Sequence, residues 1–315
     1  MTAYILNRLA IGLATLLLAS LVVFGVLSVM PGDPAQIILG MNATDDALAT
    51  LRTQLGLDQP LVVQYFQWLG GLLTFDLGQS YTYKVPVSDL ILERIGVSLP
   101  LAVLSLLLSV AIAIPVGVFA AARRGRVGDA AAMGAAQVGV AVPNFWFALI
   151  LVYIFAVWLR LLPAGGFPGW TAGLWPALKA LIMPAVALAL PQAAILARVT
   201  RSSLLEVLGE DYIRTARAKG MPRRAVLWRH ALRNAMIPVL TIMGLQFAYL
   251  LAGTIIIENV FYLPGLGRLI FQSIAQRDLI VVEGVVMLLV ASVVAINIVV
   301  DILYAIVDPR LRIRT

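Results

Sequence analysis

The charged side chains best placed for recognition chemistry lie in one basic segment, residues 198–236. This segment carries nine of the Lys and Arg residues and only three acids, and so supplies most of the net charge of +7. Guanidinium and ammonium groups pair with carboxylates of another molecule, so the segment predicts a docking surface for a partner. The centre of this surface is predicted to be Glu210, Asp211, Tyr212, Arg214, Thr215, Ala216, Arg217, Ala218, Lys219, Gly220 and Met221.

The alternative is that these charges only fix membrane orientation, because Lys and Arg concentrate in cytoplasmic loops. Orientation would explain their sign. It would not explain the length of the segment, since most connections between elements need only a few residues. The length therefore favours docking.

Polar residues within apolar stretches are a second group of candidates, because burying them in a membrane is costly. Asn144, Gln246, Tyr249 and Asn297 are predicted to line a translocation path, although Asn297 could instead bond a neighbouring helix. We expect Asp301 to pair with an Arg of the basic segment. Glu258 and Glu283 are expected to lie near the outer surface in contact with solvent.

Other kinds of chemistry find no support in the sequence. The chain has no Cys and a single His, His230, so thiolate chemistry and a His metal cluster are excluded. It has no G-x-x-x-x-G-K-[ST] loop to cradle nucleotide phosphates and no evident nucleophile–base pair. We expect no catalytic residue, no metal site and no cofactor bound by this chain. The basic balance does not indicate nucleic acid, because membrane proteins carry such charge in their loops.

The elements that position these residues are apolar stretches long enough to cross a bilayer. Apolar residues make up 61% of the chain and charged residues 12%, which predicts an all-α integral membrane protein. Six transmembrane helices are expected, the first a retained anchor. Their predicted ranges are Leu9–Met30, Leu99–Ala122, Ala131–Leu159, Lys179–Ala197, Ile237–Ile257 and Val281–Ile306.

The distribution of basic residues predicts the orientation. If both termini are cytoplasmic, 16 of the 23 Lys and Arg residues lie inside, which satisfies the positive-inside rule. The long stretch 31–98 then lies outside. Within it, Asp58 could cap an amphipathic helix that begins at Pro60 and lies on the membrane surface. Pro264-Gly265-Leu266-Gly267 predicts a turn, either structural or part of an outer gate.

Within the basic segment, the pattern predicts two short helices and a sharp turn. Ser203 and Glu206 form a capping-box pattern that would start a helix near Leu204. Gly220 would end that helix in the left-handed conformation. Pro222 would open a second helix ending near Asn234, and Pro238 would start the next span.

Several motifs, in order along the whole chain, resemble the permeases of ABC importers of the dipeptide, oligopeptide and nickel type. They are MPGDPA at 30–35, LGLDQPLVVQYFQWLGGLLTFDLGQS at 55–80, EDYIRTARAKG at 210–220, WRHALRNAMIP at 228–238, ENVFYLPGLGRLIFQSIAQRDL at 258–279 and DILYAIVDPRLR at 301–312. The resemblance is to the first, B-type membrane subunit. It implies the type I importer architecture with a cytoplasmic coupling-helix loop. The general importer motif has a Glu that this segment lacks, and Glu210 or Asp211 are the candidates to replace it.

The resemblance also implies the organisation and the partners. Residues 1–30 would be the N-terminal anchoring helix, 31–98 a periplasmic segment, and 99–315 a five-helix permease core whose ATPase-docking loop is 198–236. The expected partners are a second homologous permease, two ATP-binding subunits that bind ATP and Mg, a periplasmic solute-binding protein and membrane lipid. The chain would form half of an import path for peptides or a related small solute across the bacterial inner membrane, by alternating access. A stand-alone secondary carrier or channel is the alternative.

Overall fold

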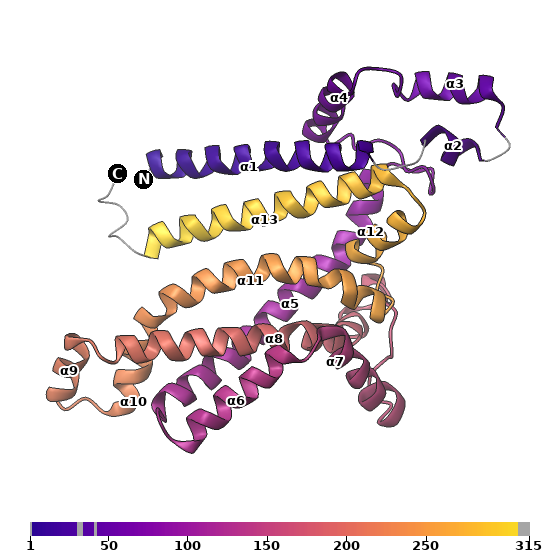
Figure 1. The fold of residues 1–315 in the computed structure, drawn as a ribbon. Coiled ribbons are helices and arrows are strands. Elements are labelled where there is room, and N and C mark those ends of the chain that lie inside the picture. The colour runs from indigo at the N-terminus through magenta and orange to yellow at the C-terminus, as the bar shows by residue number, and fades with distance from the viewer. Residues whose placement is uncertain (1, 30–33, 41–42, 308–315) are drawn as a thin grey trace.

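The chain folds into a bundle of long helices with short helices at both ends (Figure 1). The structure is a computed structural model that describes residues 2–29, 34–40 and 43–307. Outside these ranges lie residues 30–33 of the MPGDPA motif, and Arg310, Arg312 and Arg314. The α-helices are α1 (Thr2–Val29), α2 (Pro34–Leu39), α3 (Asp45–Gln54), α4 (Leu61–Thr74), α5 (Val87–Ala122), α6 (Val127–Ala141), α7 (Asn144–Leu151), α8 (Leu174–Val207), α9 (Asp211–Ala218), α10 (Arg223–Ala225), α11 (Leu232–Val260), α12 (Leu266–Ala275) and α13 (Leu279–Val307).

Within the described ranges, five helices are long and apolar enough to span a membrane, and a bent pair forms the sixth candidate span. The five are Ile5–Val29, Val87–Ala122, Leu174–Val207, Val226–Val260 and Leu279–Ile302. The predicted third span is not one straight helix. α6 and α7 meet at 99° around Pro143, and a π-helical turn at Val152–Trp158 continues α7. Proline cannot donate the backbone hydrogen bond that would carry the helix through this point.

The ends of three spans differ from the prediction because the helices continue beyond the apolar stretch. α5 begins at Val87 rather than Leu99, and its 36 residues are about 54 Å long. α8 runs through Ser203, so the predicted helix start near Leu204 is wrong. The predicted second loop helix is also not separate. From Arg223 the backbone stays helical through a π-turn at Val226–Ala231 into α11, which contains Pro238 in its interior.

The centre of the bundle is formed by α5, α7, α8 and α11. Its fully buried residues include Leu101, Leu181, Leu188 and Leu250. α8 is the most buried of the spans, and it is rich in alanine on the faces that meet its neighbours. Small side chains allow membrane helices to approach closely, which compensates for the lack of a hydrophobic driving force within lipid.

α1 and α13 lie side by side along one edge of the bundle (Figure 1). Gly244 of α11 is close to α13, since a β-carbon there would collide with the Val300 side chain. α11 therefore packs closely against a helix of the same chain at Gly244. Ala252, about two turns further along α11, is exposed.

The end of the bundle that carries α2, α3, α4 and α12 is held together by packing and by two buried carboxylates (Figure 1). α4 packs on α1 through Phe24, Tyr65 and Trp68, and the Tyr65 hydroxyl lies 2.8 Å from the Ser20 hydroxyl. The expected cap by Asp58 does not form: Pro60 precedes α4, and no side chain caps it.

The expectation that Glu258 is solvated is wrong. Its side chain is fully buried, and it accepts hydrogen bonds from the Ser98 hydroxyl at 2.5 Å and from the Gly267 and Arg268 amides at 2.7 and 3.1 Å. These bonds tie the start of α12 to α5. The Gly265 and Gly267 positions of the predicted turn leave no room for a β-carbon, which would collide with the Glu258 carboxylate and with the Ile255 backbone, respectively.

Asp278 performs the same task at the other end of α12. It is fully buried and accepts hydrogen bonds from the Ser80 hydroxyl at 2.5 Å and the Tyr81 and Thr82 amides at 3.2 and 2.9 Å. Both ends of α12 are thus bonded to α5 or to the loop that precedes it. The turn predicted at 264–267 is a structural part of this unit.

Candidate functional site

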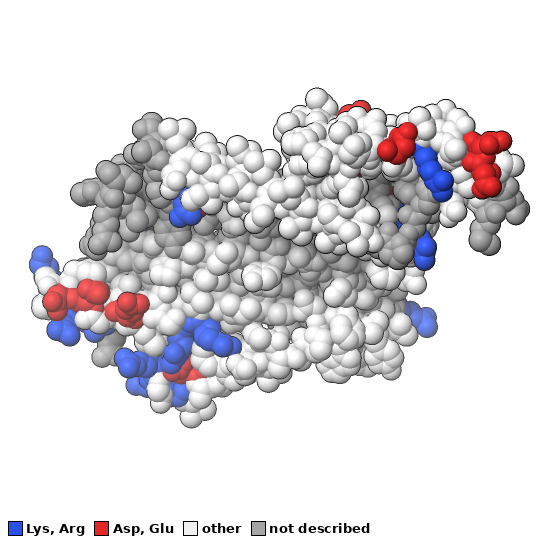
Figure 2. Space-filling model, turned by 45° about the horizontal axis from the view of Figure 1, so that its top comes forward, with Lys and Arg blue, Asp and Glu red and all other residues white. Residues whose placement is uncertain are grey.

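The candidate site is the surface around α9, at the opposite end of the bundle from α12 (Figure 1). The start of α1 and the turn between α5 and α6 lie at the same end. Figure 2 shows that charged residues gather at the two ends of the molecule, with a largely uncharged region between them on this face. This distribution is the one expected for a protein whose middle is surrounded by lipid.

Local sequence explains why α9 is short and sharply bounded. Glu210 has an extended backbone, and its carbonyl accepts the amides of Ile213 and Arg214. Asp211 in the first turn and Arg217 in the last turn complement the helix dipole. Gly220 has a φ of +79°, the left-handed conformation predicted from the sequence, and glycine adopts it without strain.

One apolar side chain anchors α9 to the bundle. Ile213 is fully buried, in a cluster with Val118 of α5, Leu204 of α8 and Val226 and Ala235 from the start of the α11 span. Ala216 and Met221 pack at the edge of the same cluster. This cluster joins α9 to the ends of three spans.

The rest of α9 faces away from the bundle. Asp211, Arg214, Thr215, Arg217, Ala218 and Lys219 are all exposed. Arg214 and Asp211 form an ion pair at 3.1 Å whose side chains remain 74% and 94% exposed, so both groups stay available to another molecule. Asn234 donates a 2.7 Å hydrogen bond to the Tyr212 hydroxyl and links α9 to α11.

A shallow hollow lies beside α9 at the start of the α11 span. Pro222, Arg224, Ala225 and Trp228 line it, and Trp228 is 48% exposed. Tryptophan and arginine are among the residues most enriched at the binding hot spots of protein interfaces. The hollow extends the candidate surface beyond the residues predicted for it.

A partly buried ion pair fixes the neighbouring turn. Arg201 of α8 donates two hydrogen bonds to Asp129 of α6, at 2.6 and 2.7 Å, and the Gly125 amide donates a third at 3.0 Å. This bidentate arrangement orients both groups. It holds the α5–α6 turn against α8 next to α9.

Sequence reasoning missed the residues that hold this surface in place. Ile213 was absent from the predicted site although it is the one large apolar side chain in a polar helix, with Ala216 three residues on. That spacing was a usable signal. The Asp129–Arg201 pair joins positions 72 residues apart, and no local pattern indicates it.

The four residues predicted for a translocation path are not brought together in this chain. Asn144 starts α7 at the bend, and Gln246 is buried and donates a 2.9 Å hydrogen bond to the Gln192 carbonyl of α8. Tyr249 is 69% exposed on the side of α11. Asn297 lines a groove with Arg8 and Asp301. The expectation that Asp301 pairs with an Arg of the basic segment is wrong. Its carboxylate pairs with Arg8 at 3.2 Å.

Two family models cover almost the whole chain. Residues 113–313 match the family described as binding-protein-dependent transport system inner membrane component, and residues 1–102 match the N-terminal model of such membrane components. A putative peptide transport system permease protein of Brucella abortus is 46% identical over 99% of each chain. A glutathione transport system permease protein of Salmonella choleraesuis is 42% identical, also over 99% of each chain.

Solved structures share the helical arrangement at low sequence identity. The methionine ABC transporter MetNI, in inward-facing conformations, matches with a TM-score of 0.55 at 19% identity, over 70% of this chain and 96% of that one. An amino acid ABC transporter matches with a TM-score of 0.51 at 17% identity, over 69% and 94%. These likenesses concern the fold alone.

The resemblance stated from the motifs is thus confirmed over the full length. It decides against a stand-alone carrier or channel. The chain belongs to the family of binding-protein-dependent transport system inner membrane components and is a membrane-spanning permease subunit of an ABC importer.

Proposed function

We propose that this permease imports peptides or a related small solute, and that α9 is the element through which partner ATPases drive it. The observation that carries the coupling role is the contrast within α9. Ile213 is fully buried against three spans, whereas Arg214, Arg217 and Lys219 are exposed. A partner that binds the exposed face can move the ends of α5, α8 and α11 together.

ATP and Mg would be bound by those partners, since the sequence has no phosphate-binding loop of its own. Binding and hydrolysis would bias an equilibrium between inward-open and outward-open states, by a differential interaction of the ATPases with the two positions of α9. In the proposed orientation α9 and both termini lie in the cytoplasm. Residues 31–86 and α12 lie on the opposite side of the membrane. The excess of Lys and Arg at the α9 end supports this orientation.

The path itself would require a second permease. Tyr249 is exposed, as are Leu245 and Ile256 on the same face of α11, and the polar residues within the described part of the chain do not enclose a passage. A homologous chain facing this surface would complete the path, and a periplasmic binding protein would deliver the solute. The names of the Brucella and Salmonella relatives support peptides, including glutathione, as the solute class.

The test is affinity purification of the tagged chain from native membranes, followed by reconstitution in liposomes. The expected result is recovery of a second permease and ATPase subunits, together with peptide uptake that requires ATP and the co-encoded binding protein. A chain that purifies alone and transports peptide without ATP would overturn the proposal. Uptake of a non-peptide solute only would overturn the solute class and leave the coupling role standing.

A further inference from the structure

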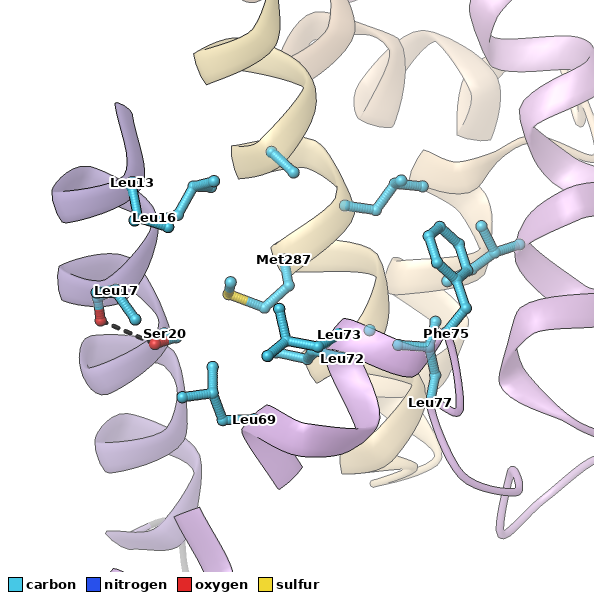
Figure 3. Close-up of a pocket in the computed structure, with 14 residues that line it drawn as sticks. Leu13, Leu16, Leu17, Ser20, Leu69, Leu72, Leu73, Phe75, Leu77 and Met287 are labelled. Carbon is cyan, nitrogen blue, oxygen red and sulfur yellow. Dashed lines mark hydrogen bonds between the residues drawn. The ribbon is translucent and has the colours of Figure 1, made fainter. Parts of the chain in front are cut away.

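The seam between α1, α4 and α13 contains two adjoining cavities with different chemistry. The first, of about 230 Å³, is lined almost entirely by aliphatic side chains (Figure 3). Leu16 and Leu17 of α1, Leu72 of α4 and Met287 of α13 border it. The second, of about 360 Å³, is lined by Phe24 of α1, Gln64 and Trp68 of α4, Tyr81 and Glu283. Leu77 borders both cavities.

The two cavities follow one another along the same helices. On α13 the polar cavity contacts Leu279 to Glu283 and the apolar cavity contacts Gly284 to Ala291. On α1 the polar cavity contacts Phe24 to Ser28 and the apolar cavity contacts Leu13 to Ser20. The seam therefore changes from polar, near the α12 end, to apolar towards the middle of the spans.

Glu283 is the only ionisable side chain on the α13 part of the seam, and it has no hydrogen bond or ion pair among the described residues. Among the residues that the structure describes, no Lys or Arg lines either cavity. Tyr81 supplies no positive charge: burial, together with Glu283 and Asp278, raises the pKa of its phenol to about 12, so the phenol stays neutral. A carboxylate at this depth is costly unless a cation pairs with it.

The apolar cavity opens on an exposed apolar part of the α1 span. Leu13 and Leu17, at its border, are 59% and 43% exposed and lie in the middle of the α1 span. A hydrocarbon chain is what the surroundings supply there. The seam thus offers an acidic group for a cationic head and, one or two turns deeper, an aliphatic slot for a tail.

We propose that this seam binds a phospholipid whose head group carries a primary ammonium, with the ammonium at Glu283 and one acyl chain in the apolar cavity. The ammonium would donate hydrogen bonds to a carboxylate that has no other partner. The acyl chain would fill space that packing leaves open between α1 and α13. The bound lipid would stabilise the contact of α1 and α4 with the rest of the bundle.

The test uses the intact importer complex in detergent, incubated with equal amounts of dioleoyl phosphatidylethanolamine, phosphatidylcholine and phosphatidylglycerol. Native mass spectrometry measures which lipid is retained. The native complex should retain the ethanolamine lipid in preference to the other two. Glu283→Gln should reduce the retention of this lipid roughly ten-fold, which is the change in affinity expected from the loss of one hydrogen bond between charged groups. Glu93→Gln, an exposed acid on α5, is the matched control and should leave retention unchanged.

The acyl-chain half of the site has its own variants. Ala291→Phe fills the apolar cavity and should reduce the retention of all three lipids, whereas Ala295→Phe, exposed on α13 and outside both cavities, should not. Equal retention of the three lipids by the native complex, or equal behaviour of Glu283→Gln and Glu93→Gln, would overturn the proposal.

A labelling experiment on the unaltered protein covers the case of variants that do not fold. An ethanolamine lipid with a photoactivatable group on its acyl chain should label the peptides around Leu16 and Met287. Excess ethanolamine lipid should suppress the label, and the tail-less glycerophosphoethanolamine should not. Label absent from these peptides, or suppression by the tail-less compound, which would indicate a site for a soluble amine, would each overturn the proposal.

Discussion

The two ends of the molecule use charged side chains in opposite ways. At the α9 end, Asp211 and Arg214 are 94% and 74% exposed and are paired only with each other. At the α12 end, Glu258 and Asp278 are fully buried and bond to Ser98, Ser80 and backbone amides. An exposed ion pair contributes little to stability, whereas a buried carboxylate whose partners are removed costs several kcal/mol. The α9 end is therefore suited to binding another molecule, and the α12 end to holding its own loops.

The largest effect is expected from the buried end. Glu258→Ala leaves the Ser98 hydroxyl and the Gly267 and Arg268 amides without their acceptor, which should cost about 3 kcal/mol or more. Thermal unfolding in detergent and the amount of protein in the membrane measure the loss. Glu93→Ala, exposed on α5, is the control and should behave like the native chain. An unchanged unfolding temperature would show that the α12 end does not depend on this carboxylate.

The anchor of α9 comes next. Ile213→Ala empties a fully buried position and should cost about 2–4 kcal/mol locally, because the cavity cannot collapse freely. We expect faster hydrogen exchange over 211–218 and weaker recovery of ATPase subunits. Ile274→Ala, an exposed isoleucine of α12 at the opposite end of the bundle, should change neither. Normal exchange and recovery in Ile213→Ala would mean that α9 is held by other contacts.

The turn after α9 should give a smaller effect on stability and a clear effect on transport. Gly220→Val places a β-branched residue at a φ of +79°, which costs about 1–2 kcal/mol. Peptide uptake should fall while the amount of protein in the membrane remains. Gly70→Val, at an exposed helical glycine of α4 with open space around it, is the comparison variant and should leave uptake unchanged. Uptake at the native level would show that coupling to transport does not require this turn.

The smallest change in stability should come from the exposed charges. Arg214→Glu with Arg217→Glu should leave the free energy of unfolding within about 0.5 kcal/mol. Recovery of ATPase subunits should nevertheless fall at low salt, and the difference from the native chain should shrink at high salt, because exposed charge pairs are screened. Arg160→Glu, exposed and remote from α9, serves as the control. Undiminished recovery would mean that these charges serve orientation only.

The sequence was most informative where a feature depends on neighbouring residues alone. The apolar stretches gave the spans, and the left-handed turn at Gly220 followed from glycine at the end of a helical pattern. Ser203 and Glu206 also matched a local pattern, yet Ser203 lies inside α8 and is buried. The packing of this turn against its neighbours outweighs a capping preference of about 1 kcal/mol.

Side chains that find partners far along the chain could not be predicted in this way. Glu258 was expected in solvent because it follows an apolar span, and only the return of the chain through Gly265 and Gly267 buries it. Asp301 was assigned an Arg of the basic segment, whereas the antiparallel contact of α1 and α13 gives it Arg8.

By itself the sequence determined that this is a helical membrane protein with a strongly basic segment, because hydrophobic length and charge are local sums over neighbouring residues. The motifs also sufficed to identify the importer permease family. The tertiary structure alone decided which acids are buried, that Ile213 joins α9 to three spans, and that the third apolar stretch bends by 99°. These features depend on contacts between residues distant in sequence, and such contacts exist only once the helices have packed.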